Sequence, residues 1–556
     1  MKSLPLARGY VPHALEFERV MENNTISARH SRLLTLPVEI LSLVIGYISG
    51  DSDTLANLAL VNSDCRQISR SYQFCSIVID YRYDRVKAFL QALLRESEQR
   101  SQHRSTRHPS LAACVRRISI STRFPNTDPS NLTSKVHPAS DVSKIHEAHL
   151  GVISLLYSMP NLETLEFCGC RFVLHYLLGS ISNATVTALK CHGETCCKGQ
   201  NLSVGTACIS SDREPLEPLA HLDIAIDSML ASSKFVCGQD FVFTNLLDKC
   251  ASSLESLKIS HNFSSARLSL ASHFSQLRSL HVVKGSLLDS RSWCSLFRCR
   301  RLSTLAVDFS DDVLRKSFVE MSPHMTLEVL VLYTINSSPD ASLLQILKNN
   351  INLEALYIGG ELPPDFINLL LSKLAGLPNL RLLSMTWSGS EITDSSLVAL
   401  STLKFLQQLH ISTGLQHGTW YNWVVDHEAL LLSLSPLKHL RRIIFTRDSY
   451  VLDNGASMIS AGGYYIHRLP ERSQWLRAIR NGLSYETVQE IWEGQHRYRM
   501  TDYAQRYAQT FKKLESIHIG QLTFDIIDHD GKRTAMLRNP HRCEDFQVVE
   551  NLFEIL

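Results

Sequence analysis

The sequence is dominated by one short motif: a leucine, two variable residues, a second leucine, one variable residue and an aliphatic residue. Eight clear copies start at residues 162, 254, 277, 302, 327, 353, 380 and 406. From Leu254 onward the starts are separated by 23, 25, 25, 26, 27 and 26 residues. Such a period is typical of a solenoid, in which each repeat is one supersecondary unit stacked on the next. Unrelated leucines of an all-helical core would not keep this spacing.

Weaker copies extend the array on both sides. They start at Val115, Val186, Leu219, Leu440 and Leu514, and their spacings reach 74 residues, which implies insertions. We expect each unit to be a short parallel strand with the second leucine and the next aliphatic residue pointing inward, followed by an amphipathic helix on the outside. The predicted fold class is therefore α/β, an irregular solenoid over residues 76–556 that is most regular at 254–412. Its strands line the concave face, and insertions are expected at about 121–155 and 450–510.

A separate apolar segment precedes the array. In LPVEILSLVIGYIS, residues 36–49, a helix beginning at Pro37 places aliphatic side chains at spacings of three, four and seven, namely Ile40, Leu41, Val44, Ile45 and Ile48. Three short helices are predicted near 37–48, 53–60 and 62–72. A domain of about forty residues is below the size that stabilises itself. These helices therefore need a partner for their apolar face.

Two families are similar to these segments. The repeats resemble leucine-rich repeats, and residues 391–412 resemble the cysteine-containing subtype found in F-box proteins. Residues 36–74 resemble an F-box through Leu36-Pro37, Glu39-Ile40-Leu41, an acidic turn at 51–53, Leu55, Leu58, Leu60-Val61, Cys65-Arg66 and Ile68. The following SYQFCSIVIDY resembles the segment that enters the first strand of the next domain in fungal F-box proteins. The expected organisation is a flexible segment at 1–31, an F-box at 32–75 and the solenoid at 76–556.

The resemblance implies a non-catalytic function. An F-box protein with leucine-rich repeats is the substrate-recognition subunit of an SCF (Skp–cullin–F-box) ubiquitin ligase, in which the F-box docks onto a Skp-type adaptor by helix-in-groove packing. The implied adaptor-binding residues are Leu36, Pro37, Ile40, Leu41, Val44, Ile45, Leu58, Leu60 and Val61. Three alternatives stay open: a helical cap that closes the solenoid, a scaffold that binds the adaptor outside ubiquitination, and a repeat-containing regulator of a GTPase.

The repeats would bind the protein substrate. Side chains alternate along a strand, so the variable positions around the inward residues point to the concave surface. The candidate substrate-binding residues are Lys258, His281, Asp308, Tyr333, Tyr357, Thr386, His410 and Thr446. Tyr333 and Tyr357 are expected at matching positions of adjacent repeats, about 5 Å apart, as a rigid platform for a protein partner. The alternative is that they only shield the strands from water.

The repeat pattern stops between residues 450 and 507, where aromatic residues and arginines accumulate. The spacing of apolar residues predicts two amphipathic helices, one with Trp475, Leu476, Ile479 and Leu483 and one with Val488, Ile491 and Trp492. This insertion either packs its tryptophans on the array as a cap or forms part of a partner-binding surface.

Several other functions are excluded by the sequence. The net charge of +2 favours neither nucleic acid nor a membrane surface. Charged residues interrupt the first twenty positions before a signal-peptide core, and no apolar run reaches eighteen residues, so we expect a cytoplasmic or nuclear protein with reduced thiols.

Enzymatic and metal chemistry are not expected either. No nucleotide-binding, zinc-protease or hydrolase motif occurs, so no catalytic residue and no cofactor are assigned. Cys191, His192, Cys196, Cys197 and Cys208 lack the paired spacing of a tetrahedral zinc site.

Overall fold

The structure is a computed structural model of the chain. It describes residues 32–80, 88, 90–93, 95–96, 111–121, 159, 161–168, 186–194, 219–227, 246–261, 269–270, 273–283, 288–333, 341–388, 392–413, 425–445, 481–482, 485–520, 522–529 and 531–538. The chain divides into two compact units, an N-terminal unit that ends at Leu277 and a C-terminal unit that begins at Arg278. Each unit is described by itself.

The N-terminal unit begins with three helices, α2 (Val38–Ile48), α3 (Ser52–Ala59) and α4 (Ser63–Gln73). Their ends lie within one residue of the predicted ranges. Two side chains define the helix starts. The Asp51 carboxylate accepts hydrogen bonds from Asp53 N and Thr54 N at 3.1 and 3.3 Å, and the Asn62 side chain accepts one from Cys65 N at 2.8 Å. These caps satisfy backbone N–H groups that have no partner within a helix.

Six parallel strands follow in sequence order. They are β1 (Ser76–Asp80), β2 (Arg117–Ser121), β3 (Thr164–Cys168), β4 (Ala188–Glu194), β5 (His221–Asp227) and β6 (Ser256–His261), with the short helix α6 (Leu111–Cys114) before β2. The weaker motif copies at 115, 186 and 219 are therefore strands, as predicted. The chain enters β1 directly after α4, which also agrees with the prediction. The expected insertion at 121–155 lies outside the described residues except for Ser121.

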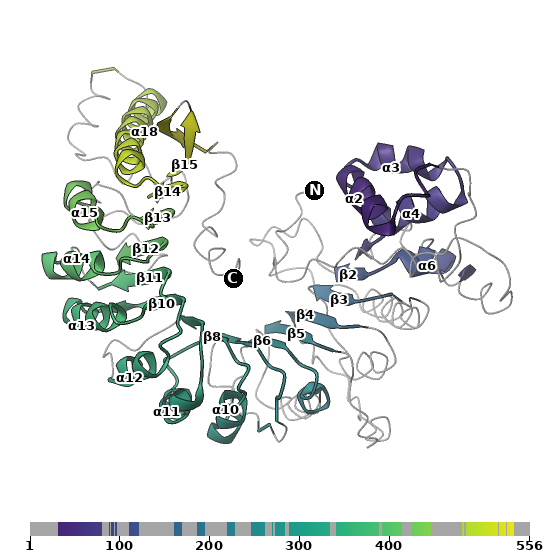
Figure 1. Cartoon of the computed structure of the whole chain (residues 1–556), viewed down its shortest axis with the longest axis horizontal. Coiled ribbons are helices and arrows are strands. Elements are labelled where there is room, and N and C mark those ends of the chain that lie inside the picture. The colour runs from purple at the N-terminus through teal and green to yellow at the C-terminus, as the bar shows by residue number, and fades with distance from the viewer. Residues whose placement is uncertain are drawn as a thin grey trace. The chain divides into compact units, whose positions relative to one another are not determined.

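The C-terminal unit repeats a strand–helix pair. Its parallel strands are β7 (Ser279–Val283), β8 (Thr304–Val307), β9 (Val329–Leu332), β10 (Ala355–Leu362), β11 (Leu382–Trp387), β12 (Gln408–Thr413), β13 (Arg442–Phe445) and β14 (Ser516–Ile519). The intervening helices are α10 (Ser290–Phe297), α11 (Asp312–Met321), the 3-10 turn η3 (Ser322–His324), α12 (Ala341–Asn349), α13 (Pro364–Leu374), α14 (Asp394–Ser401) and α15 (His427–Leu434). Figure 1 shows α10 to α15 on one side of these strands.

The repeat motif has a backbone role as well as a core role. In β10 the leucine and the aliphatic residue of the motif, Leu356 and Ile358, are fully buried. One residue before the strand, the carbonyl of Glu354 accepts two hydrogen bonds, from Arg381 N at 2.8 Å and Leu382 N at 3.0 Å. The same pair of bonds recurs at the carbonyls of Cys75, Arg116, Glu163, Thr187, Ala220, Arg278, Ser303, Glu328, Arg381, Gln407 and Arg441. Each repeat therefore fixes the register of the next.

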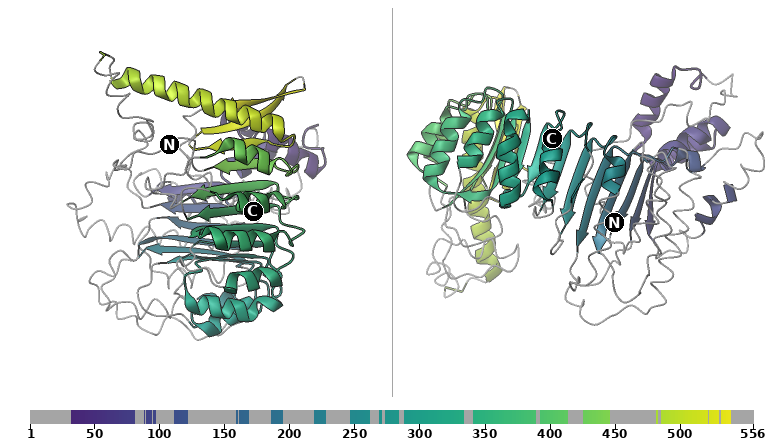
Figure 2. Two further views of the ribbon diagram at one scale, coloured as in Figure 1. Left: turned by 90° about the vertical axis from the view of Figure 1, so that its left-hand side faces the viewer. Right: turned by 90° about the horizontal axis from the view of Figure 1, so that it is seen from below.

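The C-terminal end departs from the repeat pattern. The helix α18 (Tyr485–Thr510, 26 residues) precedes β14, and β15 (Leu522–His529) and β16 (Lys532–Leu537) continue the sheet antiparallel. Figure 2 shows α18 running beside these strands. Gln505 joins them, since its side chain donates to Arg533 O at 2.7 Å and accepts from Ala535 N at 3.0 Å. Of the two helices predicted here, the second is part of α18, and most of the first lies outside the described residues.

In the part of the chain that the structure describes, no helix combines the length and the apolar character needed to cross a membrane.

Candidate protein-interaction surfaces

Large apolar side chains are exposed along α2 and at the two residues that follow α3. Ile40 is 44% exposed, Leu60 76% and Val61 66%. Leu36, Leu43, Val44 and Tyr47 are exposed as well. A monomeric protein rarely exposes so many large apolar side chains within so short a segment. We call these seven residues the α2/α3 surface.

Four of the residues predicted to bind an adaptor, Pro37, Leu41, Ile45 and Leu58, are not among these seven. Leu41 and Ile45 are each 1% exposed and form the core of the three helices with Leu34, Leu55, Cys65 and Ile68. Leu58 packs against the same core. The prediction that Leu41 and Ile45 face a partner is therefore wrong, because the helices use these side chains to hold themselves together. Pro37 is exposed at the N-cap of α2.

The three helices join the first repeat through α4. Gln67 is buried, and its side-chain amide donates to Cys114 Sγ of α6 at 3.4 Å. Ser69 of the same helix is also fully buried. Ile40, Leu43, Val44 and Tyr47 of α2 remain exposed, so they do not face the repeats as a closing cap would require. Leu43 and Tyr47 were not among the predicted residues, although Leu43 lies three residues after Ile40 and Tyr47 three residues after Val44.

The substrate-binding candidates that the structure describes lie on the face of the sheet opposite the buried motif leucines, which we call the non-core face. Strand pairing places His281, Ala306, Val331, Tyr357, Ser384 and His410 in one row across β7 to β12. Tyr333 is two residues beyond Val331, the residue opposite Tyr357. The prediction that Tyr333 and Tyr357 occupy matching positions is therefore wrong, because it did not fix the strand register.

The two tyrosines nevertheless lie together. Their ring centroids are 6.5 Å apart at an interplanar angle of 58°. Tyr333 Oη lies 2.6 Å from Nε2 of His281, whose ring stacks on that of Tyr333 at 5.3 Å. We call His281, Tyr333 and Tyr357 the aromatic patch. All three side chains are half-buried.

Other candidates are not accessible. Thr386 and His410 are each 3% exposed, so the prediction that they contact a substrate is wrong for this conformation. His410 Nδ1 lies 2.6 Å from Ser384 Oγ, and burial, with a smaller effect of His518, lowers the pKa of His410 to about 3. Asp308 follows β8 and is half-buried. Thr446 lies outside the described residues.

Lys258 belongs to a row of alternating charges in the N-terminal unit. Strand pairing aligns Glu166, Lys190, Asp223 and Lys258 on the non-core face of β3 to β6. Glu166 pairs with Lys190 at 3.2 Å, and Asp223 lies 4.0 Å from Lys258. Burial raises the pKa of Asp223, but His192 and Lys258 outweigh it and leave that pKa below its usual value. Aligning the weaker motif copies would have revealed this row from sequence.

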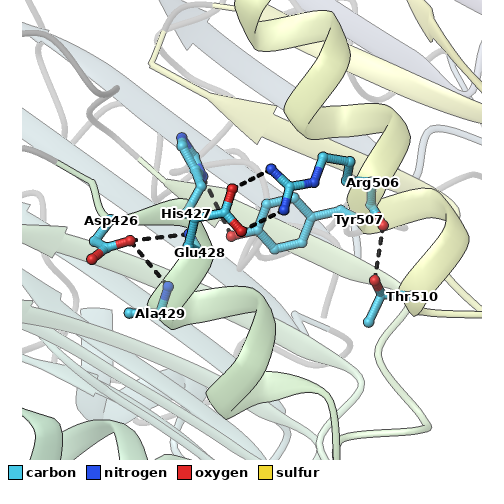
Figure 3. A network of polar contacts seen from close by, with 7 residues as sticks. All are labelled: Asp426, His427, Glu428, Ala429, Arg506, Tyr507 and Thr510. Carbon is cyan, nitrogen blue, oxygen red and sulfur yellow. Dashed lines mark hydrogen bonds and ion pairs between the residues drawn. The ribbon is translucent and has the colours of Figure 1, made fainter.

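Helices α15 and α18 meet in a polar and aromatic network (Figure 3). The Asp426 carboxylate caps α15 by accepting from Glu428 N and Ala429 N, both at 3.0 Å. Glu428 pairs with both terminal nitrogens of the Arg506 guanidinium. His427 lies beside Tyr507, with Nδ1 3.3 Å from the hydroxyl.

This network supports one interpretation of the insertion at 450–510. Tyr507 is fully buried, and its ring contacts Phe445 at 5.7 Å and Phe511 at 6.0 Å. The C-terminal half of α18 therefore packs on the repeats as a cap does. The side chain of Trp492 is not among those the structure describes.

The cysteine-rich stretch offers no described ligand cluster. Cys191 is buried in β4, and His192 Nε2 lies 3.1 Å from Asp223 Oδ1. Cys196, Cys197 and Cys208 lie outside the described residues. Among the residues that are described, no three histidine, cysteine or acidic side chains are grouped as metal ligands.

Comparisons with known proteins give only distant likenesses. No protein-family model and no curated protein matches the sequence. A chain of the crystal structure of the TLR13–ssRNA13 complex aligns with a TM-score of 0.30 and 13% identity. The alignment covers 53% of this chain and 44% of the TLR13 complex chain, so this protein spans less than half the length of that chain. A chain of the crystal structure of the Rad7 and Elc1 complex in yeast aligns with a TM-score of 0.33 and 14% identity, over 76% of this chain and 95% of that one. These values are too low to support an argument about function.

Proposed function

We propose that this protein is the non-catalytic substrate-recognition subunit of a cullin-type ubiquitin ligase. In this proposal, residues 32–75 are an F-box that docks onto a Skp-type adaptor, and the leucine-rich repeats bind the protein to be ubiquitinated. Such a subunit needs no catalytic group, because it acts by holding the substrate near the ubiquitin-charged enzyme.

The observation that carries the proposal is that some aliphatic residues of the three helices are buried in a core while others are exposed. Leu41, Ile45 and Leu55 form a small core, and α4 attaches the helices to the repeats. The residues of the α2/α3 surface are exposed and can contact another protein. Leu60 and Val61 are the most exposed aliphatic residues of this surface. Helix-in-groove recognition uses such a face.

The test is capture of the adaptor by the full chain. Leu60→Asp with Val61→Asp places two charges on the α2/α3 surface and is expected to abolish capture, because an unpaired charge is costly to bury in an interface. Circular dichroism should be unchanged, since neither residue belongs to the core. Val398→Asp, at a similarly exposed valine of α14, is the matched control and should leave capture intact.

The proteins that co-purify decide between the proposal and its alternatives. Adaptor together with cullin supports the ligase subunit. Adaptor without cullin would instead support a scaffold outside ubiquitination. Full capture by the double variant would show that the α2/α3 surface is not the docking site.

A further inference from the structure

Acidic side chains accompany the aromatic patch on the non-core face of the sheet. Strands β7 to β12, over the residues the structure describes, contain no lysine or arginine, and Glu361 is their one carboxylate. Asp308 directly follows β8, and continuation of the β8–β9 register places it beside Tyr333. Alternation from the buried Val307 and Leu362 puts both carboxylates on the non-core face.

The position of Tyr333 is fixed from three sides. Its hydroxyl reaches His281 on β7 although Tyr333 itself follows β9, so its side chain crosses β8. The residue of β8 in that row is Ala306, which is small and buried. Gly359 adjoins both tyrosines: a Cβ there would lie 2.6 Å from Tyr333 O and 2.9 Å from Tyr357 Cε1. The tyrosine faces are therefore held in place before any ligand arrives.

Two arginines near these strands in the sequence lie at the other edge of the sheet, while Lys284, which follows β7, lies outside the described residues. Arg278 and Arg381 stand just before β7 and β11, whereas Asp308 and Tyr333 stand just after β8 and β9. In a parallel sheet the strand starts share one edge and the strand ends share the other. The Asp308 carboxylate is also oriented, because its Oδ1 accepts from Ser310 N at 3.1 Å and Ser310 Oγ at 2.7 Å.

We propose that the aromatic patch, with Asp308 and Glu361, binds a cationic side chain, arginine or lysine, of a protein partner. The face of a tyrosine ring is negative and attracts a guanidinium or ammonium group. Two carboxylates complete the complementarity and disfavour acidic partners. The inference rests on the proposed receptor function and specifies the chemistry of the substrate segment.

The test uses the purified full chain and fluorescence anisotropy. The probes are labelled glycine–serine peptides that carry arginines, citrullines or glutamates at the same positions. Citrulline keeps the shape of arginine without its charge. The arginine peptide should bind at least about fivefold more tightly than the citrulline peptide, and the glutamate peptide should bind least.

Variants of the two carboxylates and of one tyrosine test whether the peptide binds at the aromatic patch. Asp308→Asn with Glu361→Gln, and separately Tyr357→Leu, should each weaken arginine-peptide binding by at least about fivefold. Asp312→Asn with Glu320→Gln removes the same charge from α11 and should have no effect, and thermal melting confirms that each variant is folded. Equal affinity for arginine and citrulline, no binding of the arginine peptide, or equal loss in the α11 control would overturn the proposal. Adaptor capture by the same preparations is scored separately, so a failed ligase function is distinguished from a failed patch.

Discussion

The burial of His410 should make the C-terminal unit sensitive to acid. The pKa of His410 is lowered to about 3 by burial, and the unfolded chain has an ordinary value near 6.5. Between these values the unfolded state binds more protons than the folded state, so the free energy of unfolding falls as the pH falls. At pH 5 the loss from this residue is about 2 kcal/mol relative to pH 7.

Urea unfolding at pH 7 and pH 5 measures this effect. His410→Gln should reduce the difference between the two pH values by about that amount, whatever its own cost at pH 7. His324→Gln changes an exposed histidine of the same unit and should leave the difference unchanged. A variant that keeps the full wild-type pH dependence would show that His410 does not cause it.

The sequence could indicate which residues of α2 are apolar but not which of them face a partner. Ile40, Leu41, Val44 and Ile45 form one wide stripe on a helix, and spacing alone cannot divide it. The division comes from α3 and α4, whose Leu55 and Ile68 cover Leu41 and Ile45 and leave Ile40 exposed. Burial is thus decided by tertiary packing, which a single helical pattern does not contain.

At the scale of elements, the attachment of α18 depends on packing more than on charge. Tyr507→Ala should destabilise the C-terminal unit by about 3–5 kcal/mol, as large-to-small changes of buried aromatic residues do. Arg506→Ala removes the exposed pair with Glu428 and the contact of the guanidinium with the Tyr503 ring, and should shift the urea midpoint far less. Chemical denaturation of both variants measures this, and a larger effect from Arg506 would contradict it.

The repeat array illustrates what a period can and cannot predict. The motif located the strands from β2 to β14, because each copy buries the same leucine and uses the same carbonyl bonds. It could not give the register shift between Tyr357 and Glu361 in β10, which depends on a local irregularity around Gly359. The antiparallel strands β15 and β16 carry no copy of the motif and were therefore not predicted.

At the scale of the whole molecule, a receptor needs two surfaces that act independently. The α2/α3 surface and the aromatic patch belong to different compact units and share no residue. Changes at the two surfaces are therefore expected to combine without coupling. This expectation can be measured by proximity labelling in cells with and without proteasome inhibition.

Each set of variants should give its own signature. With the wild-type chain, substrates should accumulate among the labelled proteins only when the proteasome is inhibited. With Leu60→Asp and Val61→Asp, the same substrates should be labelled without the inhibitor, because they are bound but no longer delivered to the ligase. With Asp308→Asn and Glu361→Gln, substrate labelling should fall under both conditions while adaptor and cullin labelling stays at the wild-type level. Loss of adaptor labelling in this second set would show that the two surfaces are coupled, since neither carboxylate lies in the N-terminal unit.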